Sequence, residues 1–257
     1  SSAGGSARRM RGTGAPVKPA APGSAMGEAS MTPLCLHGVV FPADTPAEAP
    51  AHRQVPLGPV SALVSDMTSP PGEPDGLHAV LAHDLLLGLY LMTGPVLPVR
   101  LGTCFSDSAV LQAAITPQLP NLELKLRKMS GLAEYALVVE EAPLTPVQPL
   151  PQPANGRDFL RARKQLRDTR SFEAEARATD LRHLRSHASA VAKDCDLRPV
   201  MAPRLLSLSL LMDPVAATLL QTSLPDWSAA SGMSARLTGP FPPYSFANLP
   251  MEDMTDA

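Results

Sequence analysis

The stretch Arg204–Pro214, "RLLSLSLLMDP", carries the clearest structural pattern in this chain of 257 residues. Its leucines, from Leu206 to Leu210, alternate with serines, which is the pattern of a strand with one buried face. Asp213 followed by Pro214 is typical of a helix start, with a capping side chain and then a first-turn proline. The stretch therefore predicts a strand that leads directly into a helix.

Further elements are predicted on both sides of this stretch. A strand is expected over 132–141, and a long charged helix opens at Asn155-Gly156, with Asp180 as a possible second cap. The helix after Pro214 carries Val215, Leu219, Leu220 and Leu224, and a last strand at 233–238 follows Gly232. The order strand, helix, helix, strand, helix, strand favours a ferredoxin-like α+β unit.

The first half of the chain predicts a second α+β unit. Strands are expected at 34–41, 59–67 and 96–105, a helix capped by Ser106 or Asp107 follows, and we favour a helix around 122–129. A further helix is expected over 77–92, and its apolar residues fall largely on one side, which we take as the core face. Those residues are Leu77, Val80, Leu81, Leu85, Leu89 and Met92.

These elements predict an α+β protein of two domains that meet near residue 130. We expect a disordered leader at 1–30, an N-terminal domain at 31–130 and a ferredoxin-like domain at 131–239. A stiff spacer with five prolines, residues 143–153, is read as an insertion inside the second domain. Residues 240–257 form a C-terminal tail that packs on the fold.

Composition excludes several classes of protein. The formal charge of −2 calls for neither nucleic acid nor an anionic membrane as a partner. No run approaches the length of a transmembrane helix. The three cysteines, Cys35, Cys104 and Cys195, lie far apart, so a disulfide framework is unexpected and a reducing compartment is the simpler interpretation.

Residue patterns for chemistry are weak. No phosphate-cradling glycine loop is found, and His183 and His187 are interpreted as part of a solvated helix face rather than a zinc site. Cys35 and His37 share a strand face but are interpreted as buried side chains rather than a thiol nucleophile and its base. The basic stretch 157–170 favours a solvated face or a docking surface for an acidic protein over nucleic-acid binding. We therefore expect no catalytic residue, cofactor or metal.

The segment Leu237–Phe246, "LTGPFPPYSF", resembles the C-terminal signature of the gas vesicle protein F/L family (GvpF/GvpL), with Phe241 where tryptophan is common. Three other stretches resemble the family in the same order: "LCLHGVVFPAD" at 34–44, "VLPVRLGTCF" at 96–105 and "NGRDFLRARK" at 155–164. The matching positions that we take as interaction or structural residues are Pro98, Arg100, Gly102, Gly156, Arg157, Arg161, Gly239, Pro240, Pro242, Pro243, Tyr244 and Phe246.

The resemblance implies an accessory or minor structural protein of gas vesicles, the shells that give microbes buoyancy, without enzymatic activity. It implies binding to the small hydrophobic shell protein and to other accessory proteins, at the gas vesicle in the cytoplasm. Two alternatives stay open: a ferredoxin-like ligand-binding or regulatory module, and a thiol enzyme that uses Cys35 or Cys104. We interpret the segment 240–246 as a structural clamp whose aromatic side chains pack inward.

Overall fold

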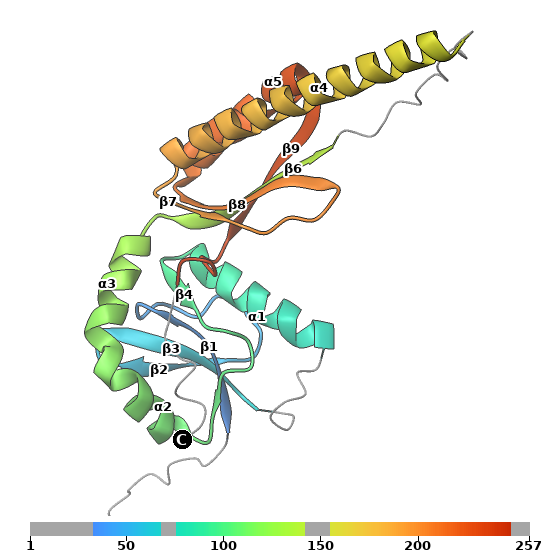
Figure 1. Cartoon of the computed structure of the whole chain (residues 1–257). Helices are drawn as coiled ribbons and strands as arrows, with labels where there is room; N and C mark the ends of the chain where they lie inside the picture. Colours follow the sequence, from blue (N-terminus) through green and yellow to red (C-terminus); the bar gives the residue numbers. More distant parts are fainter. Residues whose placement is uncertain (1–32, 68–75, 142–154, 248–257) are drawn as a thin grey trace, which may run out of the picture.

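The computed structural model describes residues 33–67, 76–141 and 155–247 (Figure 1). These residues form two antiparallel sheets, each with its own helices, stacked along the length of the molecule. The expected α+β class is confirmed. The expected leader at 1–30, the proline-rich insertion at 143–153 and the tail beyond Ala247 lie outside the described residues.

The first sheet has the strand order β2-β3-β1-β4, and a short β5 pairs with β1 beyond β4. The expected strand at 96–105 is two short strands, because a turn in which Gly102 has φ +89° separates them. The sequence reading also missed β2, an edge strand interrupted by Pro56. The strands are β1 (Leu34–Val40), β2 (Arg53–Leu57), β3 (Val60–Asp66), β4 (Val96–Pro98) and β5 (Cys104–Phe105).

Helices cover both faces of this sheet. Alternation along β3 sends Ala62 and Val64 into one core and Leu63 into another. The larger core is covered by α2 and α3, and the smaller core is covered by α1. The helices are α1 (Gly76–Leu91), α2 (Ser108–Ile115), the 3-10 turn η1 (Thr116–Gln118) and α3 (Leu119–Met129). Asp107 caps α2 as expected, accepting hydrogen bonds from the backbone of Ala109 and Val110.

Helix α1 forms where the sequence predicts it, but the expected core face is wrong. The buried side chains are His83, Leu86, Leu87 and Tyr90. The predicted face points to solvent, with Leu77 73% and Leu81 54% exposed. Because α1 is apolar on nearly every side, periodicity does not choose between its faces. The other exposed members of the predicted face are Val80, Leu85 and Met92.

The second sheet has the strand order β7-β8-β6-β9, and its elements follow the order β6, α4, β7, β8, α5, β9. Both helices lie on one face, where they bury one side of β6 and β8 (Figure 1). As expected, Asp213 caps α5, and Gly232 ends it at φ +69°. The elements are β6 (Ala133–Glu141), α4 (Gly156–Val191), β7 (Asp194–Leu197), β8 (Arg204–Met212), α5 (Pro214–Ser231) and β9 (Met233–Phe241).

Helix α4 differs from the expectation in two ways. It continues through Asp180, so the predicted second cap is wrong and one helix of 36 residues replaces two. Its inner half buries Leu184 and Ala188, but Phe159 and Leu166 are exposed, because the sheet does not extend beneath the outer half. The next element, β7, was not predicted.

Helix α5 buries two of the four apolar residues named for it from the sequence. Leu220 and Leu224 are buried, whereas Val215 and Leu219 point to solvent. The helix contacts the sheet through the narrow face that carries Ala217, Leu220 and Leu224. Val215 and Leu219 lie outside this face, so the sheet does not cover them.

Strand β8 confirms the alternation that predicted it, but only along its first half. From Leu208 onward every side chain is buried, including Ser209 and Leu211 on the face opposite the helices. Leu211 belongs to the core of the first sheet. This face is buried because the first sheet and the C-terminal segment lie against it.

Candidate functional site at the junction of the two sheets

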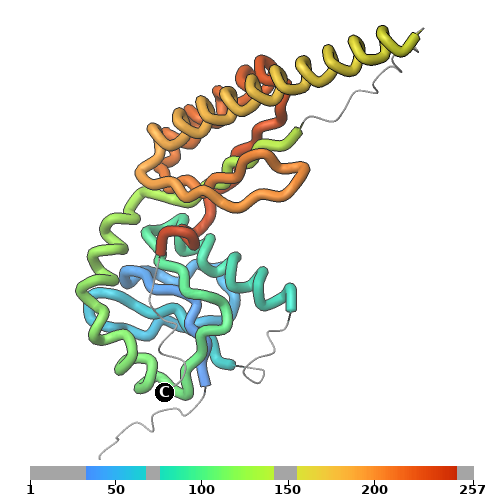
Figure 2. The backbone as a smooth tube through the Cα atoms, in the orientation of Figure 1, coloured from blue at the N-terminus to red at the C-terminus, as the bar shows by residue number. Residues whose placement is uncertain are grey.

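The C-terminal segment Pro242–Ala247 connects the two sheets. After β9, which runs to Phe241 rather than ending at 238 as expected, the chain turns back onto the first sheet (Figure 2). Pro242 and Pro243 are buried, and Phe246 and Ala247 join the core of the first sheet. The predicted tail at 240–257 therefore starts inside a strand, and its last described residue, Ala247, lies in the core of the first sheet.

Ser245 holds this segment to the second sheet. Its backbone N–H donates to Glu134 at 2.8 Å, and its hydroxyl hydrogen-bonds the other oxygen of the same carboxylate. The hydroxyl also contacts Ser209 at 3.1 Å and the guanidinium of Arg198. Glu134 is only 8% exposed, so these partners replace the water that a buried carboxylate would otherwise require.

Tyr244 holds the same segment to the first sheet. Its hydroxyl donates to Asp84 on α1 at 3.0 Å, and its ring stacks on His83 with centroids 6.2 Å apart. Burial, followed by the Asp84 carboxylate, raises the pKa of the Tyr244 hydroxyl above its ordinary value, so it remains a donor at neutral pH. Two consecutive residues thus hold the segment in place: Tyr244 binds α1 over the first sheet, and Ser245 binds β6 in the second sheet.

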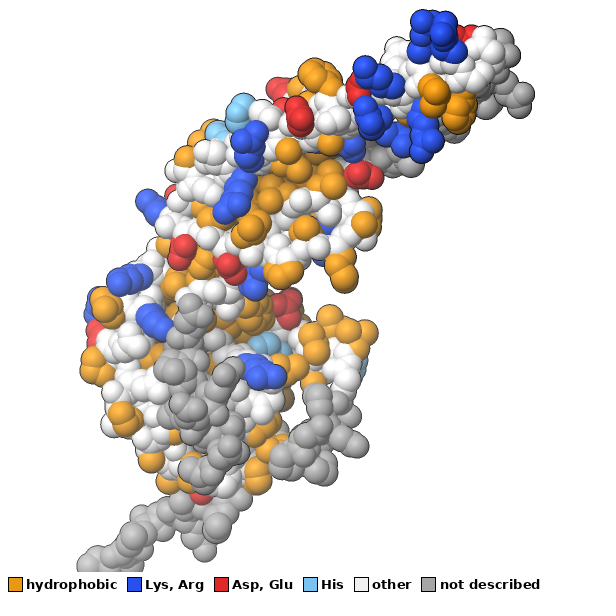
Figure 3. Space-filling model, viewed as in Figure 1, with side chains coloured by type: hydrophobic (Ala, Val, Ile, Leu, Met, Phe, Trp, Pro, Cys, Tyr) orange, Lys and Arg blue, Asp and Glu red, His pale blue; other side chains and the backbone are white. Residues whose placement is uncertain are grey.

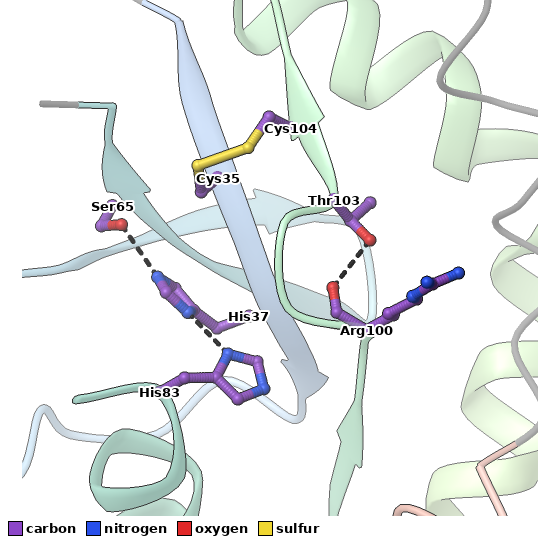
Figure 4. The surroundings of a disulfide bond; sticks show 7 residues. All are labelled: Cys35, His37, Ser65, His83, Arg100, Thr103 and Cys104. Carbon is purple, nitrogen blue, oxygen red and sulfur yellow. Dashed lines mark hydrogen bonds between the residues drawn. A yellow bond between two sulfur atoms is a disulfide. The ribbon is translucent and has the colours of Figure 1, made fainter. Parts of the chain in front are cut away.

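A histidine pair lies behind Tyr244. The Nδ1 atoms of His37 and His83 are 2.9 Å apart, and His37 Nε2 lies 2.8 Å from the Ser65 hydroxyl (Figure 4). Burial, followed by the neighbouring His83 and His52, lowers the pKa of His37 from 6.5 to about 4. Burial also lowers the pKa of His83, with Asp84 opposing. Both rings are neutral near pH 7, because each pKa lies below the ordinary value of 6.5.

A disulfide joins Cys35 and Cys104, which stand opposite each other on β1 and β5 with their Cα atoms 4.1 Å apart (Figure 4). This corrects the expectation that no disulfide forms and that both are simple buried thiols. The pairing was missed because 69 residues separate the two cysteines and only the sheet brings them together. Cys195 is a free thiol.

The predicted family positions fall in three places. Pro98 is buried at the end of β4, and Arg100 and Gly102 form the following turn, in which the Thr103 hydroxyl donates to the Arg100 carbonyl at 2.8 Å. Gly239 (φ +139°), Pro240, Pro242, Pro243, Tyr244 and Phe246 lie at or near the junction.

The third group of predicted positions lies away from the junction. Gly156, Arg157 and Arg161 lie at the outer end of α4, far from the junction where the two sheets meet (Figure 1). The structure therefore separates these three residues from the other nine.

The expectation that the aromatic side chains pack inward holds only in part. Phe246 is half-buried against the first core, but Phe241 and Tyr244 are 37% and 41% exposed. Sequence reasoning also missed Glu134, Asp84 and His83, which hold the segment. The only sequence signal for Glu134 was a carboxylate that directly precedes the apolar run 135–139 of the same strand.

Among the described residues, no three histidine, cysteine or acidic side chains are placed to hold a metal ion. None of the described helices combines the length and apolar character needed to cross a membrane. The junction is therefore a network of hydrogen bonds and packed side chains that joins two sheets.

The fold and the junction define a two-sheet α+β protein in which the C-terminal segment ties the sheets together. The model of the family described as gas vesicle synthesis protein GvpL/GvpF matches residues 43–248, and the chain belongs to this family. Gas vesicle protein L of Streptomyces sp. (strain CB03234) is 26% identical over 190 residues, which are 68% of this chain and 71% of that protein.

Two solved structures share the fold. GvpF from Microcystis aeruginosa superposes with a TM-score of 0.63 at 15% identity, covering 85% of this chain and 100% of that one. GvpF from Anabaena sp. PCC7120 gives a TM-score of 0.65 at 11% identity, covering 85% of this chain and 99% of that one. The resemblance read from the sequence motifs is thus confirmed at the level of the family.

Proposed function

We propose that this protein acts in gas vesicle assembly by binding the small hydrophobic shell protein through the exposed face of α1. The observation that carries the proposal is the α1 stripe, defined as Leu77, Leu81 and Leu85, whose side chains are 73%, 54% and 51% exposed. Their spacing of four residues aligns them on one side of the helix. Family membership supplies the biological setting.

The α1 stripe suits an apolar partner. A helix that is apolar all round is normally buried, so an exposed apolar face indicates a surface that another molecule covers. Val80 and Met92 extend the apolar area, at 48% and 76% exposure. A shell subunit with a gas-facing apolar surface is prone to aggregation before assembly. Contact with the stripe would shield that surface until the subunit is added.

The test is a binding measurement between the purified chain and the shell protein. We expect the double variant Leu81→Glu, Leu85→Glu to weaken binding at least about 10-fold, because two carboxylates would be desolvated in the contact. The matched control is Val215→Glu, Leu219→Glu on α5, with the same spacing and 69% and 64% exposure. Equal binding by the α1 variant and the parent would overturn the proposal, provided that both melt at the same temperature.

The finer architecture is part of the same proposal. We assign the second sheet with α4 and α5 to the ferredoxin-like class, supported by its element order and its strand order. We place the boundary between the two domains near residue 130, and we assign the segment 240–246 the role of a structural clamp. Other gas vesicle accessory proteins are further proposed partners, at the gas vesicle in the cytoplasm.

A further inference from the structure

The outer half of α4 forms an arm, defined as residues 156–176. Every residue from 159 to 176 is exposed, and the first ion pair to the sheet is Arg177 with Glu141 at 3.3 Å. At 1.5 Å per residue the arm is about 30 Å long. Most helical stability in proteins comes from packing of one helix face against the rest of the molecule. The arm has no such packing among the described residues, so a partner that covers one of its faces would stabilise it.

The arm continues the face by which α4 packs on its sheet. Leu166 precedes the buried Leu184 by 18 residues, which is about five helical turns, so both point in the same direction. Phe159 lies one heptad before Leu166 on that face, and Ala162 lies between them. Phe159 is 50% and Leu166 37% exposed. The apolar face that binds the sheet thus extends beyond the sheet without a described covering.

The arm is also basic. Residues 157–170 carry six cationic and two anionic side chains, a net charge of +4, and with Glu173 and Glu175 the whole arm carries +2 in a chain of −2. Arg161 pairs with Asp158 at 4.0 Å and Arg167 with Asp168 at 3.6 Å. Across the described ranges no acidic group pairs with the remaining four cations, which are Arg157, Arg163, Lys164 and Arg170. Figure 3 shows Lys and Arg side chains gathered at the outer end of α4, next to apolar side chains.

We propose that the arm binds an acidic amphipathic helix of another protein. Arg163 and Arg170 follow Phe159 and Leu166 by four residues each, so two cations border the apolar stripe on the same face. A partner with an apolar stripe and flanking carboxylates would complement both properties. A second copy of this chain does not supply this complement, because each arm itself carries a net charge of +2. This site is separate from the α1 stripe and does not depend on the proposed function.

The test uses the full chain and two fluorescent synthetic peptides of equal composition. One peptide has leucines at helical spacing flanked by glutamates, and the other has the same residues scrambled so that no apolar stripe forms. Fluorescence anisotropy at about 0.15 M salt limits long-range attraction between exposed charges. We expect the amphipathic peptide to bind at least about 10-fold more tightly than the scrambled peptide. Equal binding would overturn the proposal, since only net charge would then matter.

Two charge-reversal variants locate the contact on the arm. Arg163→Glu, Arg170→Glu changes the face that carries the stripe, and we expect binding to weaken at least about 10-fold. Arg157→Glu, Lys164→Glu makes the same change in charge on the opposite face and should weaken it only about 2-fold. Both sites are exposed, so the fold should be unaffected. Equal losses would contradict the proposal, as would stronger binding to anionic lipid vesicles or single-stranded RNA than to the amphipathic peptide.

Discussion

The hydroxyl of Tyr244 donates a hydrogen bond to the carboxylate of Asp84 at 3.0 Å, although 160 residues separate the two in the sequence. Tyr244 lies in the segment that follows β9 of the second sheet, and Asp84 lies on α1, the helix that covers one face of the first sheet. The adjacent Ser245 binds Glu134 at the start of β6, so two consecutive residues hold both sheets. The C-terminal segment is therefore a tie between parts of the molecule.

The tie can be tested at Tyr244. We expect Tyr244→Phe to lower the free energy of unfolding by about 1 kcal/mol, because only the hydrogen bond to Asp84 is lost. Tyr244→Ala also removes the ring that stacks on His83, so its loss should be larger, about 2 kcal/mol. Chemical denaturation measures both. An unchanged stability of Tyr244→Ala together with lost vesicle formation would instead identify Tyr244 as a contact for a partner.

Gly239 is a second test of the junction. Its φ is +139°, and a Cβ there would lie 2.7 Å from Cδ1 of Tyr135 and 2.9 Å from the Glu134 carbonyl oxygen. We expect Gly239→Ala to destabilise the protein by about 3 kcal/mol, through strain and overpacking together. The control is Gly232→Ala, where φ is +69° but no atom lies within 4 Å. That variant should cost about 1 kcal/mol, and equal losses would argue against a close approach at Gly239.

The buried histidine pair predicts a pH dependence of stability. The pKa of His37 is about 4 in the folded protein and 6.5 ordinarily, so the unfolded chain binds more protons between these values. Stability should therefore be complete above about pH 6.5 and fall as the pH decreases towards about 4. In His37→Gln this part of the pH dependence should disappear when unfolding is measured across that window. The same slope in the variant would assign the effect to other groups.

The disulfide predicts an effect of reductant. We expect Cys104→Ser to lower the free energy of unfolding by about 2–4 kcal/mol under oxidising conditions, because the bond closes a loop of 69 residues. Added dithiothreitol should bring the parent down to the variant. Cys195→Ser is the control, since Cys195 is free and should show no such effect. Mass spectrometry without reductant should find the peptides of Cys35 and Cys104 joined.

The local elements could be predicted because their signals lie within a few residues. Asp213-Pro214 sets the start of α5 and Gly232 its end, since capping depends on side chains next to the helix ends. The alternation in β8 likewise follows from the pleat of a strand. The predicted core face of α1 was wrong, because this helix is apolar on nearly every side and only its neighbours decide which side is covered.

The sequence by itself determined most of the strands and helices and, through its motifs, the family, because each depends on local patterns of side chains, but it missed the edge strands β2 and β7. Only the tertiary structure decided that Cys35 meets Cys104, that Glu134 receives Ser245, and that the α1 stripe faces solvent. These contacts join residues far apart in the chain. They depend on how the two sheets and their helices pack, and a local pattern carries no record of that packing.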